Sequence, residues 1–141
     1  MKKSNITLFI LTIIVVLTVI YGYLDGGSPK SAQNKRSDST RVQNIRTIKN
    51  WVNSYFQTNK ILPKTVLEAS KGSNSPPSMV IPTEVIPTDP ETKNDYEYAS
   101  TSLSEFKVCA TFSESTLNNT SDKDFEHPSG YYCYTFTAGK Y

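Results

Sequence analysis

The longest apolar segment of the chain covers residues 6–24 (ITLFILTIIVVLTVIYGYL) and contains no charged residue. Lys2 and Lys3 precede it, and the turn-forming sequence DGGSP follows it at residues 25–29. At about 1.5 Å of rise per residue, a helix of this length spans the ~30 Å hydrocarbon core of a lipid bilayer. A helix also satisfies its own backbone hydrogen bonds, as a lipid environment requires. We therefore expect residues 1–25 to form a transmembrane helix that contacts the bilayer through residues 6–24.

A cleaved signal peptide is the main alternative for this segment. Signal peptides have apolar cores of about 7–15 residues, followed by small residues at the cleavage site. Here the core is longer, and it ends in Tyr21, Tyr23 and Leu24, whose bulk does not suit cleavage. Tyrosine side chains instead favour the interface between membrane and water. The pattern therefore favours an uncleaved signal-anchor.

A second hydrophobic pattern follows residues 26–37 (GGSPKSAQNKRS), which have the composition of a flexible linker. Apolar residues then recur at steps of three and four, which predicts an amphipathic helix over about residues 39–57. Pro63 prevents the helix from continuing far beyond that point. The apolar positions are Val42, Ile45, Ile48, Trp51, Val52, Tyr55 and Phe56.

The region between this helix and the first strand is expected to be mostly irregular. Residues 62–70 predict an extended step and one short helical turn, and residues 71–78 predict a loop. Prolines restrict residues 80–87 to extended edge segments at most. Residues 88–92 (TDPET) predict a turn in which Asp89 caps the backbone.

Three segments near the end of the chain predict β-strands, at residues 96–99, 105–113 and 131–137. Apolar and polar residues alternate in the second and third, so one face of the sheet packs on a core and the other meets water. The predicted fold of residues 38–141 is α+β, with one amphipathic helix packed on a three-stranded antiparallel sheet. The inward positions of the last two strands are Phe106, Val108, Ala110, Phe112, Tyr132, Tyr134 and Phe136.

Composition changes this picture little. The net charge of +2 is too small to indicate a nucleic-acid partner. Arg41, Arg46 and Lys49 of the predicted helix could face a phosphate group, but a solvated helix surface is the simpler interpretation of these positions. Nine tyrosines and six phenylalanines supply much of the core of a small sheet.

Cys109 and Cys133 are the two cysteines of the chain, and each lies on the less apolar face of its predicted strand. If the strands are neighbours, both sulfur atoms emerge on the same side of the sheet. A cysteine pair in a small domain outside the cytoplasm predicts a disulfide. Closing a loop of about 24 residues stabilises a fold by roughly 3 kcal/mol in the chain-entropy model. The alternatives are a redox-active pair or a metal site, but C-x-x-C spacing is absent and His127 is the single histidine.

The cysteine pair also bears on orientation. Basic residues flank both ends of the apolar segment almost equally, so charge alone does not set the topology. The short basic N-terminal flank and the expected disulfide both favour a cytoplasmic N-terminus and an extracytoplasmic C-terminal domain. We therefore expect a single-pass membrane protein.

Short sequence words along the chain point to a family. They comprise Arg41, Val42, Ile45, Arg46, Ile48, Tyr55, Phe56, Leu62, Pro63, residues 89–92, Tyr96, Tyr98, Phe106, Val108, Cys109, Ala110 and Phe112. Together they resemble the globular part of type IV pilin-like and type II secretion pseudopilin-like proteins. In that family a helix packs on a short antiparallel sheet, and a D-P turn leads into a Y-x-Y strand. The segment with His127, Gly130 and Cys133 is also similar to the C-terminal domain of uncharacterised membrane proteins of candidate-phylum bacteria.

The chain departs from pilin-like precursors in its apolar segment. Those precursors carry a Gly-Phe cleavage site and a glutamate a few residues into the apolar helix, which aids subunit assembly. Here residues 3–6 (KSNI) lead directly into the uncharged segment, and the expected linker interrupts the long helix on which filament packing depends. The resemblance therefore implies the pilin-like fold, and neither processing by a prepilin peptidase nor incorporation into a filament.

Candidate chemistry is limited to the loop between the second and third predicted strands. Asp122, Asp124 and Glu126 alternate there and offer the hard oxygen ligands that Ca²⁺ prefers. Major pseudopilins bind calcium in the corresponding loop. A solvated acidic loop is the alternative, since Lys123 intervenes and no glycine marks a tight turn around a ligand. His127 is expected to be structural, because no nucleophile pattern accompanies it.

The sequence as a whole predicts a non-enzymatic protein, since it contains no G-x-S-x-G, H-E-x-x-H or glycine-rich phosphate loop. We expect a membrane-anchored extracytoplasmic structural or interaction module, such as a minor pseudopilin-like component of a secretion or surface-appendage system. Its expected partners are the bilayer and other envelope or pilus-like proteins. A calcium- or ligand-binding envelope domain is the alternative.

Overall fold

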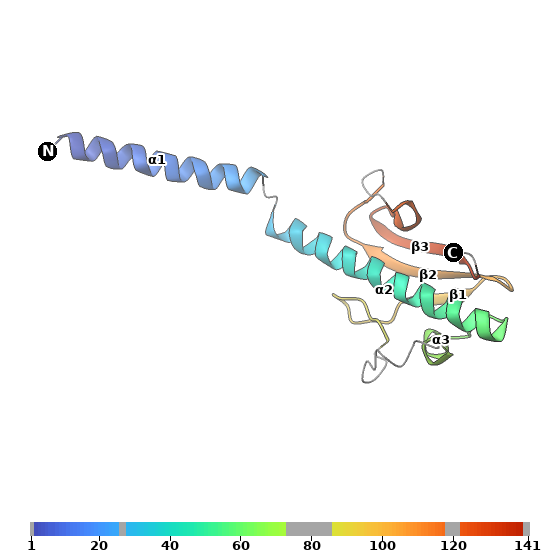
Figure 1. Cartoon of the computed structure of the whole chain (residues 1–141). Helices are drawn as coiled ribbons and strands as arrows, with labels where there is room; N and C mark the ends of the chain where they lie inside the picture. Colours follow the sequence, from blue (N-terminus) through green and yellow to red (C-terminus); the bar gives the residue numbers. More distant parts are fainter. Residues whose placement is uncertain (1, 26–27, 73–85, 118–121, 140–141) are drawn as a thin grey trace. The chain divides into compact units, whose positions relative to one another are not determined.

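The computed structural model describes residues 2–25, 28–72, 86–117 and 122–139 (Figure 1). The chain forms two compact units, Met1–Asn34 and Lys35–Tyr141. The elements are the helices α1 (Lys2–Asp25), α2 (Pro29–Asn59) and α3 (Val66–Gly72), the strands β1 (Glu97–Ser100), β2 (Glu105–Phe112) and β3 (Gly130–Thr137), and the 3-10 turn η1 (Lys123–Phe125). The α+β class predicted from the sequence is confirmed.

Helix α1 contains the apolar segment that was expected to be helical. The large apolar side chains described in it, including Phe9, are exposed. The hydroxyl groups of Thr12 and Thr18 donate to the carbonyl oxygens of Phe9 and Val15 at 2.8 Å, so these polar groups are satisfied within the helix. Among the residues that the structure describes, no helix meets both the length and the apolarity needed to cross a membrane.

Helix α2 begins at Pro29, whereas the sequence predicted a start near residue 39 and a flexible linker over residues 26–37. The earlier start has a local cause, because the Ser31 N–H donates to Ser28 Oγ at 3.2 Å and the Ala32 N–H donates to the Ser28 carbonyl. Serine is a favoured N-cap, and proline at the first helical position has its φ already set for the helix. The segment from Pro29 onward is therefore helical, and the predicted helix start is corrected.

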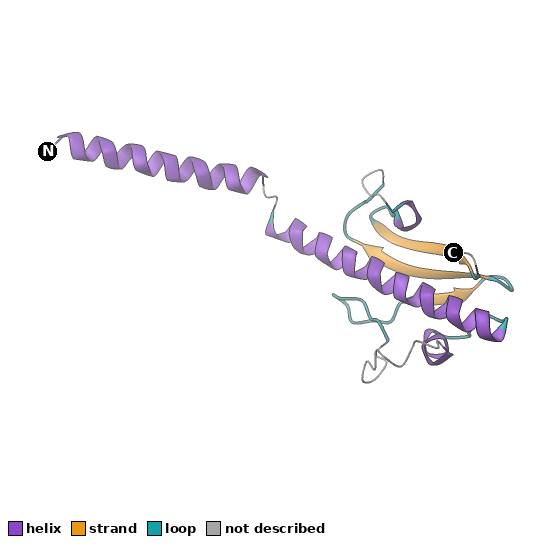
Figure 2. Ribbon diagram, viewed as in Figure 1, coloured by secondary structure: helices purple, strands orange, loops and turns teal. Residues whose placement is uncertain are grey.

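The apolar stripe predicted on this helix is confirmed. Ile45, Ile48 and Val52 are fully buried, and Val42, Trp51 and Phe56 pack beside them. Figure 2 shows α2 crossing one face of the sheet, and side chains from both elements form one hydrophobic cluster. The core of the domain therefore lies between α2 and the sheet.

The sheet is antiparallel with the order β1-β2-β3, and its strands agree with the predicted ones to within one residue at each end. In the register, Phe106 lies opposite Phe136 and Val108 lies opposite Tyr134. These four side chains point toward α2 and are buried. Lys107 and Thr135, which lie opposite each other, are exposed on the other face. The predicted alternation of the strands is therefore confirmed.

The connection between α2 and the sheet is held at its two described ends. Tyr98 on β1 donates from its hydroxyl to the Pro63 carbonyl at 2.9 Å, and Tyr55 on α2 donates to Glu68 on α3 at 2.6 Å. Thr88 forms a β-bridge with Asp95 across the predicted turn. Residues 73–85, with most of the predicted loop and the edge segment near residue 81, lie outside the described residues.

Candidate functional site

The most unusual polar feature of the domain is a buried arginine, Arg41, on α2. Its side chain is 3% exposed and bonds to three carboxylates. Nη1 donates to Asp38 at 2.8 Å, Nε and Nη2 donate to Asp89 at 2.7 and 3.2 Å, and Nη2 also donates to Glu91 at 2.7 Å. The prediction that Arg41 belongs to a solvated surface is therefore wrong. The turn after residue 88 folds over this side of the helix. Its carboxylates, Asp89 and Glu91, take the place that water would have around the guanidinium.

Two of these carboxylates also cap backbone segments. Asp38 accepts the N–H groups of Ser113 and Glu114, at the end of β2, at 3.0 and 2.9 Å. Asp89 Oδ1 accepts the N–H groups of Glu91 and Thr92, both at 2.9 Å, which confirms its predicted role in the turn. A single guanidinium therefore joins α2, the turn and the end of β2.

The network shifts the pKa of Arg41, Asp89 and Glu91. Burial by itself raises the pKa of Asp89, but hydrogen bonds from Arg41 and from the Thr92 and Glu91 N–H groups lower that pKa to about 2. The hydrogen bond from Arg41 also lowers the pKa of Glu91. Hydrogen bonds to Asp89, opposed by burial, raise the pKa of Arg41. Arg41, Asp89 and Glu91 are therefore ionised at neutral pH.

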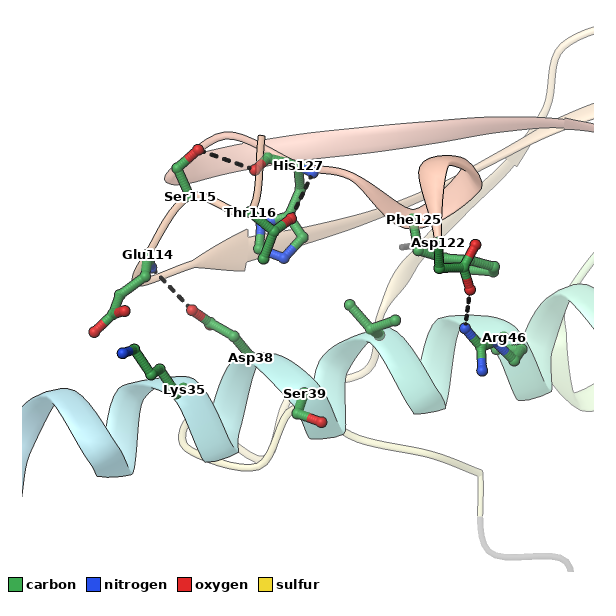
Figure 3. Close-up of a pocket in the computed structure, with 11 residues that line it drawn as sticks. Lys35, Asp38, Ser39, Arg46, Glu114, Ser115, Thr116, Asp122, Phe125 and His127 are labelled. Carbon is green, nitrogen blue, oxygen red and sulfur yellow. Dashed lines mark hydrogen bonds and ion pairs between the residues drawn. The ribbon is translucent and has the colours of Figure 1, made fainter. Parts of the chain in front are cut away.

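A cleft of about 590 Å³ lies beside this network, between the first half of α2 and the loop after β2 (Figure 3). Its walls carry both signs of charge and some apolar surface. Such a surface suits a small polar group or a peptide side chain rather than a large apolar ligand. The lining residues are Lys35, Asp38, Ser39, Val42, Arg46, Glu114, Ser115, Thr116, Asp122, Phe125 and His127.

His127 lies in the wall of the cleft and is 1% exposed. Its ring stacks on Phe112 with 3.7 Å between ring centroids. Its backbone pairs with Thr116, whose N–H donates to the His127 carbonyl at 2.9 Å and whose hydroxyl accepts the His127 N–H at 3.1 Å. These contacts agree with the structural role expected for His127.

The residues predicted to bind calcium are not directed toward one point. Asp122 forms an ion pair with Arg46, and Glu126 accepts a hydrogen bond from Lys123 Nζ at 2.9 Å. Asp124 is exposed on η1. Within residues 2–25, 28–72, 86–117 and 122–139, no three acidic, histidine or cysteine side chains are grouped to hold a metal ion. Calcium binding remains a prediction from the sequence alone.

The predicted disulfide is present. Cys109 on β2 and Cys133 on β3 lie directly opposite in the register, and their sulfur atoms are 2.12 Å apart. The bond crosses the two strands on the sheet face that points away from α2. It therefore closes the loop that carries η1 and one wall of the cleft.

Sequence reasoning missed the Arg41 network and the cleft. One local signal was available, because Asp38 and Arg41 are three residues apart and face the same side of a helix. Asp89 and Glu91 are about fifty residues further along, so their pairing with Arg41 has no local signature.

Comparison of the chain with protein-family models, with curated proteins and with solved structures gives no match. The order of elements is consistent with the fold that the sequence resemblance implies. A long N-terminal helix is followed by a helix packed on a small antiparallel sheet that carries a disulfide.

Proposed function

We propose that the chain is a membrane-anchored, extracytoplasmic interaction or structural module of the cell envelope, and that its role is non-enzymatic. The observation that carries this proposal is α1, a helix with an uncharged apolar segment over residues 6–24. Its described side chains are exposed. Transferring such a surface from water into lipid is strongly favourable. The bilayer is therefore the partner that we assign to α1.

The disulfide supports the extracytoplasmic part of the proposal. Structural disulfides persist in oxidising compartments and are rare in the cytoplasm. The bond between Cys109 and Cys133 therefore favours a domain that is exported. With Lys2 and Lys3 as a short basic flank before the apolar segment, the proposed topology places the N-terminus in the cytoplasm and residues 38–141 outside.

We infer further that the domain is pilin-like and serves in a secretion or surface-appendage system as a minor pseudopilin-like component. The order of elements supports this, as does the D-P turn at residues 89–92 that leads into β1. The missing Gly-Phe site and the missing glutamate in the apolar segment separate the chain from filament-forming subunits.

Membrane extraction tests the anchor. The full chain, expressed in a bacterium, is expected to remain in the membrane pellet after alkaline carbonate treatment. A Val15→Arg/Val16→Arg variant is expected to lose this retention, because each arginine at a helix centre costs about 3 kcal/mol of insertion free energy. Val15→Leu/Val16→Leu is the matched control and should behave like the unaltered chain.

The same cells test the topology. A thiol-reactive polyethylene glycol should label Cys109 and Cys133 only after reduction, and protease added outside the inner membrane should digest the domain. A protected domain with two free thiols contradicts the proposal.

Ligand binding is the second candidate function, and the cleft beside α2 favours it. Calcium is the ligand with a sequence rationale, through Asp122, Asp124 and Glu126. Calcium binding predicts that EDTA lowers the melting temperature of the full chain and that added CaCl₂ restores it. An Asp124→Asn/Glu126→Gln variant should no longer respond. An unchanged melting temperature in EDTA ends the calcium hypothesis.

A further inference from the structure

Strand β3 forms one outer edge of the sheet, and within the described part of the chain no other strand pairs with its outer side. In an antiparallel sheet the N–H and C=O of one residue face the same neighbour. The Glu105 carbonyl accepts from Thr101 on the β1 side, and the Ser104 carbonyl accepts from Ala138 on the β3 side. Alternate residues of β3 therefore face β2, and the remaining ones face away from the sheet.

The register shows which residues of β3 face β2 and which face outward. Gly130, Tyr132, Tyr134 and Phe136 lie opposite the β2 residues that face β3, so their backbone groups point toward β2. The backbone groups of the alternate residues point outward; these residues are Tyr131, Cys133, Thr135 and Thr137. Among the described residues, no backbone or side-chain group bonds to the N–H and C=O of these four.

The two edges of the sheet differ in how they are protected. β1 spans only Glu97–Ser100, carries a charged residue, and is tied through Tyr98 to Pro63. β3 spans Gly130–Thr137 and contains neither a charged residue nor a proline. Short length, charges and prolines are the usual devices that prevent a strand from pairing with another chain. β3 has none of them, and its residues favour the extended conformation.

We propose that the open edge of β3 pairs, antiparallel, with β3 of a second copy of this chain. Self-pairing about a two-fold axis places Cys133 opposite Thr135 of the other copy and Tyr131 opposite Thr137. This register satisfies all the outward groups with about eight hydrogen bonds and joins two sheets into one of six strands.

The chemistry of the strand favours a second copy over other partners. An uncharged strand meets its own copy without repulsion and offers a charged segment nothing to bind. The Tyr131 hydroxyl donates to Glu97 Oε2 on β1 at 2.6 Å, so this side chain leans across β2 and leaves the outer edge of β3 uncovered.

A charge at Thr135 tests this interface. Within one copy, residue 135 lies opposite Lys107, so Thr135→Glu gains an ion pair and keeps the fold. Between two copies the same change places two carboxylates at about 7 Å, diagonal to each other across the axis. Thr135→Gln is the matched neutral control. In sedimentation of the full chain in detergent, Glu should weaken self-association about tenfold or more, and Gln should leave it close to that of the unaltered chain.

Crosslinking tests the register directly. Benzoylphenylalanine placed at Thr137, in a mixture of isotopically light and heavy chains, should give light–heavy crosslinks to the segment around Tyr131. Crosslinks to lipid, to another protein or to a different face overturn the proposal. Equal self-association of the Thr135→Glu and Thr135→Gln variants also overturns the proposal, because the chains would then associate through α1 and not through β3. The proposed pairing depends on β3 alone. Release of the chain from the membrane pellet by carbonate would therefore contradict the membrane anchor and leave the β3 proposal unaffected.

Discussion

Two arginines on α2 show how differently one residue type behaves at two depths of the same helix. Arg41 is 3% exposed and bonds to three carboxylates, one on its own helix and two on the turn after residue 88. Arg46, little more than one turn later, is 47% exposed and pairs with Asp122, itself 44% exposed. The Arg46 guanidinium also lies over the Phe125 ring, 4.7 Å from its centroid.

The difference between the two sites lies in what happens when the arginine is removed. Without Arg46, Asp122 keeps its contact with water, so little free energy is at stake. Without Arg41, the buried carboxyl groups of Asp38 and Asp89 lose their charged partner in a place where water cannot replace the guanidinium. The buried network is therefore needed for the stability of this region, whereas the exposed pair contributes little to it.

The largest expected effect is that of Arg41→Ala. It leaves uncompensated buried carboxylates, which typically lowers the free energy of unfolding by about 3–5 kcal/mol. Urea denaturation followed by tryptophan fluorescence of Trp51 measures this loss. Arg41→Lys keeps the charge but cannot present the planar fork to Asp89, so its loss should be intermediate. A loss below 1 kcal/mol for Arg41→Ala would show that the network is dispensable.

Asp89→Asn should have the next largest effect. The amide oxygen can still cap the Glu91 and Thr92 N–H groups, but Arg41 loses the carboxylate to which it donates two hydrogen bonds. Hydrogen bonds to charged groups contribute about 1.5–3 kcal/mol, so we expect a loss of about 2 kcal/mol in the same denaturation experiment. Asp124→Asn, on the exposed turn η1, is the control and should change stability little. Equal losses of unfolding free energy for Asp89→Asn and Asp124→Asn would contradict the distinction between the buried network and the exposed surface.

Acid should weaken the domain through the same network. The folded-state pKa of Asp89 is about 2, below its ordinary value of 3.8, and that of Glu91 is also lowered. The unfolded chain therefore binds more protons in acid, and stability falls as the pH drops from about 4 toward 2. For Asp89 this corresponds to about 2 kcal/mol. In Asp89→Asn, the free energy of unfolding should fall less steeply as the pH is lowered. Identical slopes in this variant and in the unaltered chain would show that protonation of Asp89 is not the cause.

Arg46→Ala marks the smallest expected effect. Exposed ion pairs contribute about 0–1 kcal/mol, and the contact with the Phe125 ring adds a similar amount. We expect a loss of about 1 kcal/mol that shrinks when salt is raised, because only the charged part is screened. Arg46→Lys should retain most of the stability. A loss as large as that of Arg41→Ala would erase the distinction between the two sites.

The parts of the fold that follow from local pattern were predictable from the sequence. Ile45, Ile48 and Val52 lie on one face by their spacing alone, and the alternation of β2 and β3 placed Cys109 and Cys133 on one side of adjacent strands. The predicted start of α2 is too late because residues 28–37 contain no apolar residue larger than Ala32, although Ser28 and Pro29 carry a helix-start signal.

The candidate site was less accessible to sequence reasoning for a physical reason. A charged residue beside an apolar stripe is normally solvated, so Arg41 gave no sign of burial. Its burial depends on Asp89 and Glu91, which reach it only after the turn has folded over α2. The cleft likewise combines side chains of α2 with those of a distant loop. Both features are products of tertiary contacts.

The bond between Cys109 and Cys133 also has a mechanical consequence. When the chain is pulled from its two ends, the tension that reaches Cys109 crosses directly to Cys133 through the sulfur atoms. The residues between the two cysteines, which are 24 positions apart and enclose η1 and His127, are thereby shielded from the load. Extending the molecule completely would yield a contour shorter by roughly 80 Å than in the reduced chain. The loop wall of the cleft would keep its covalent closure while the remaining chain is stretched.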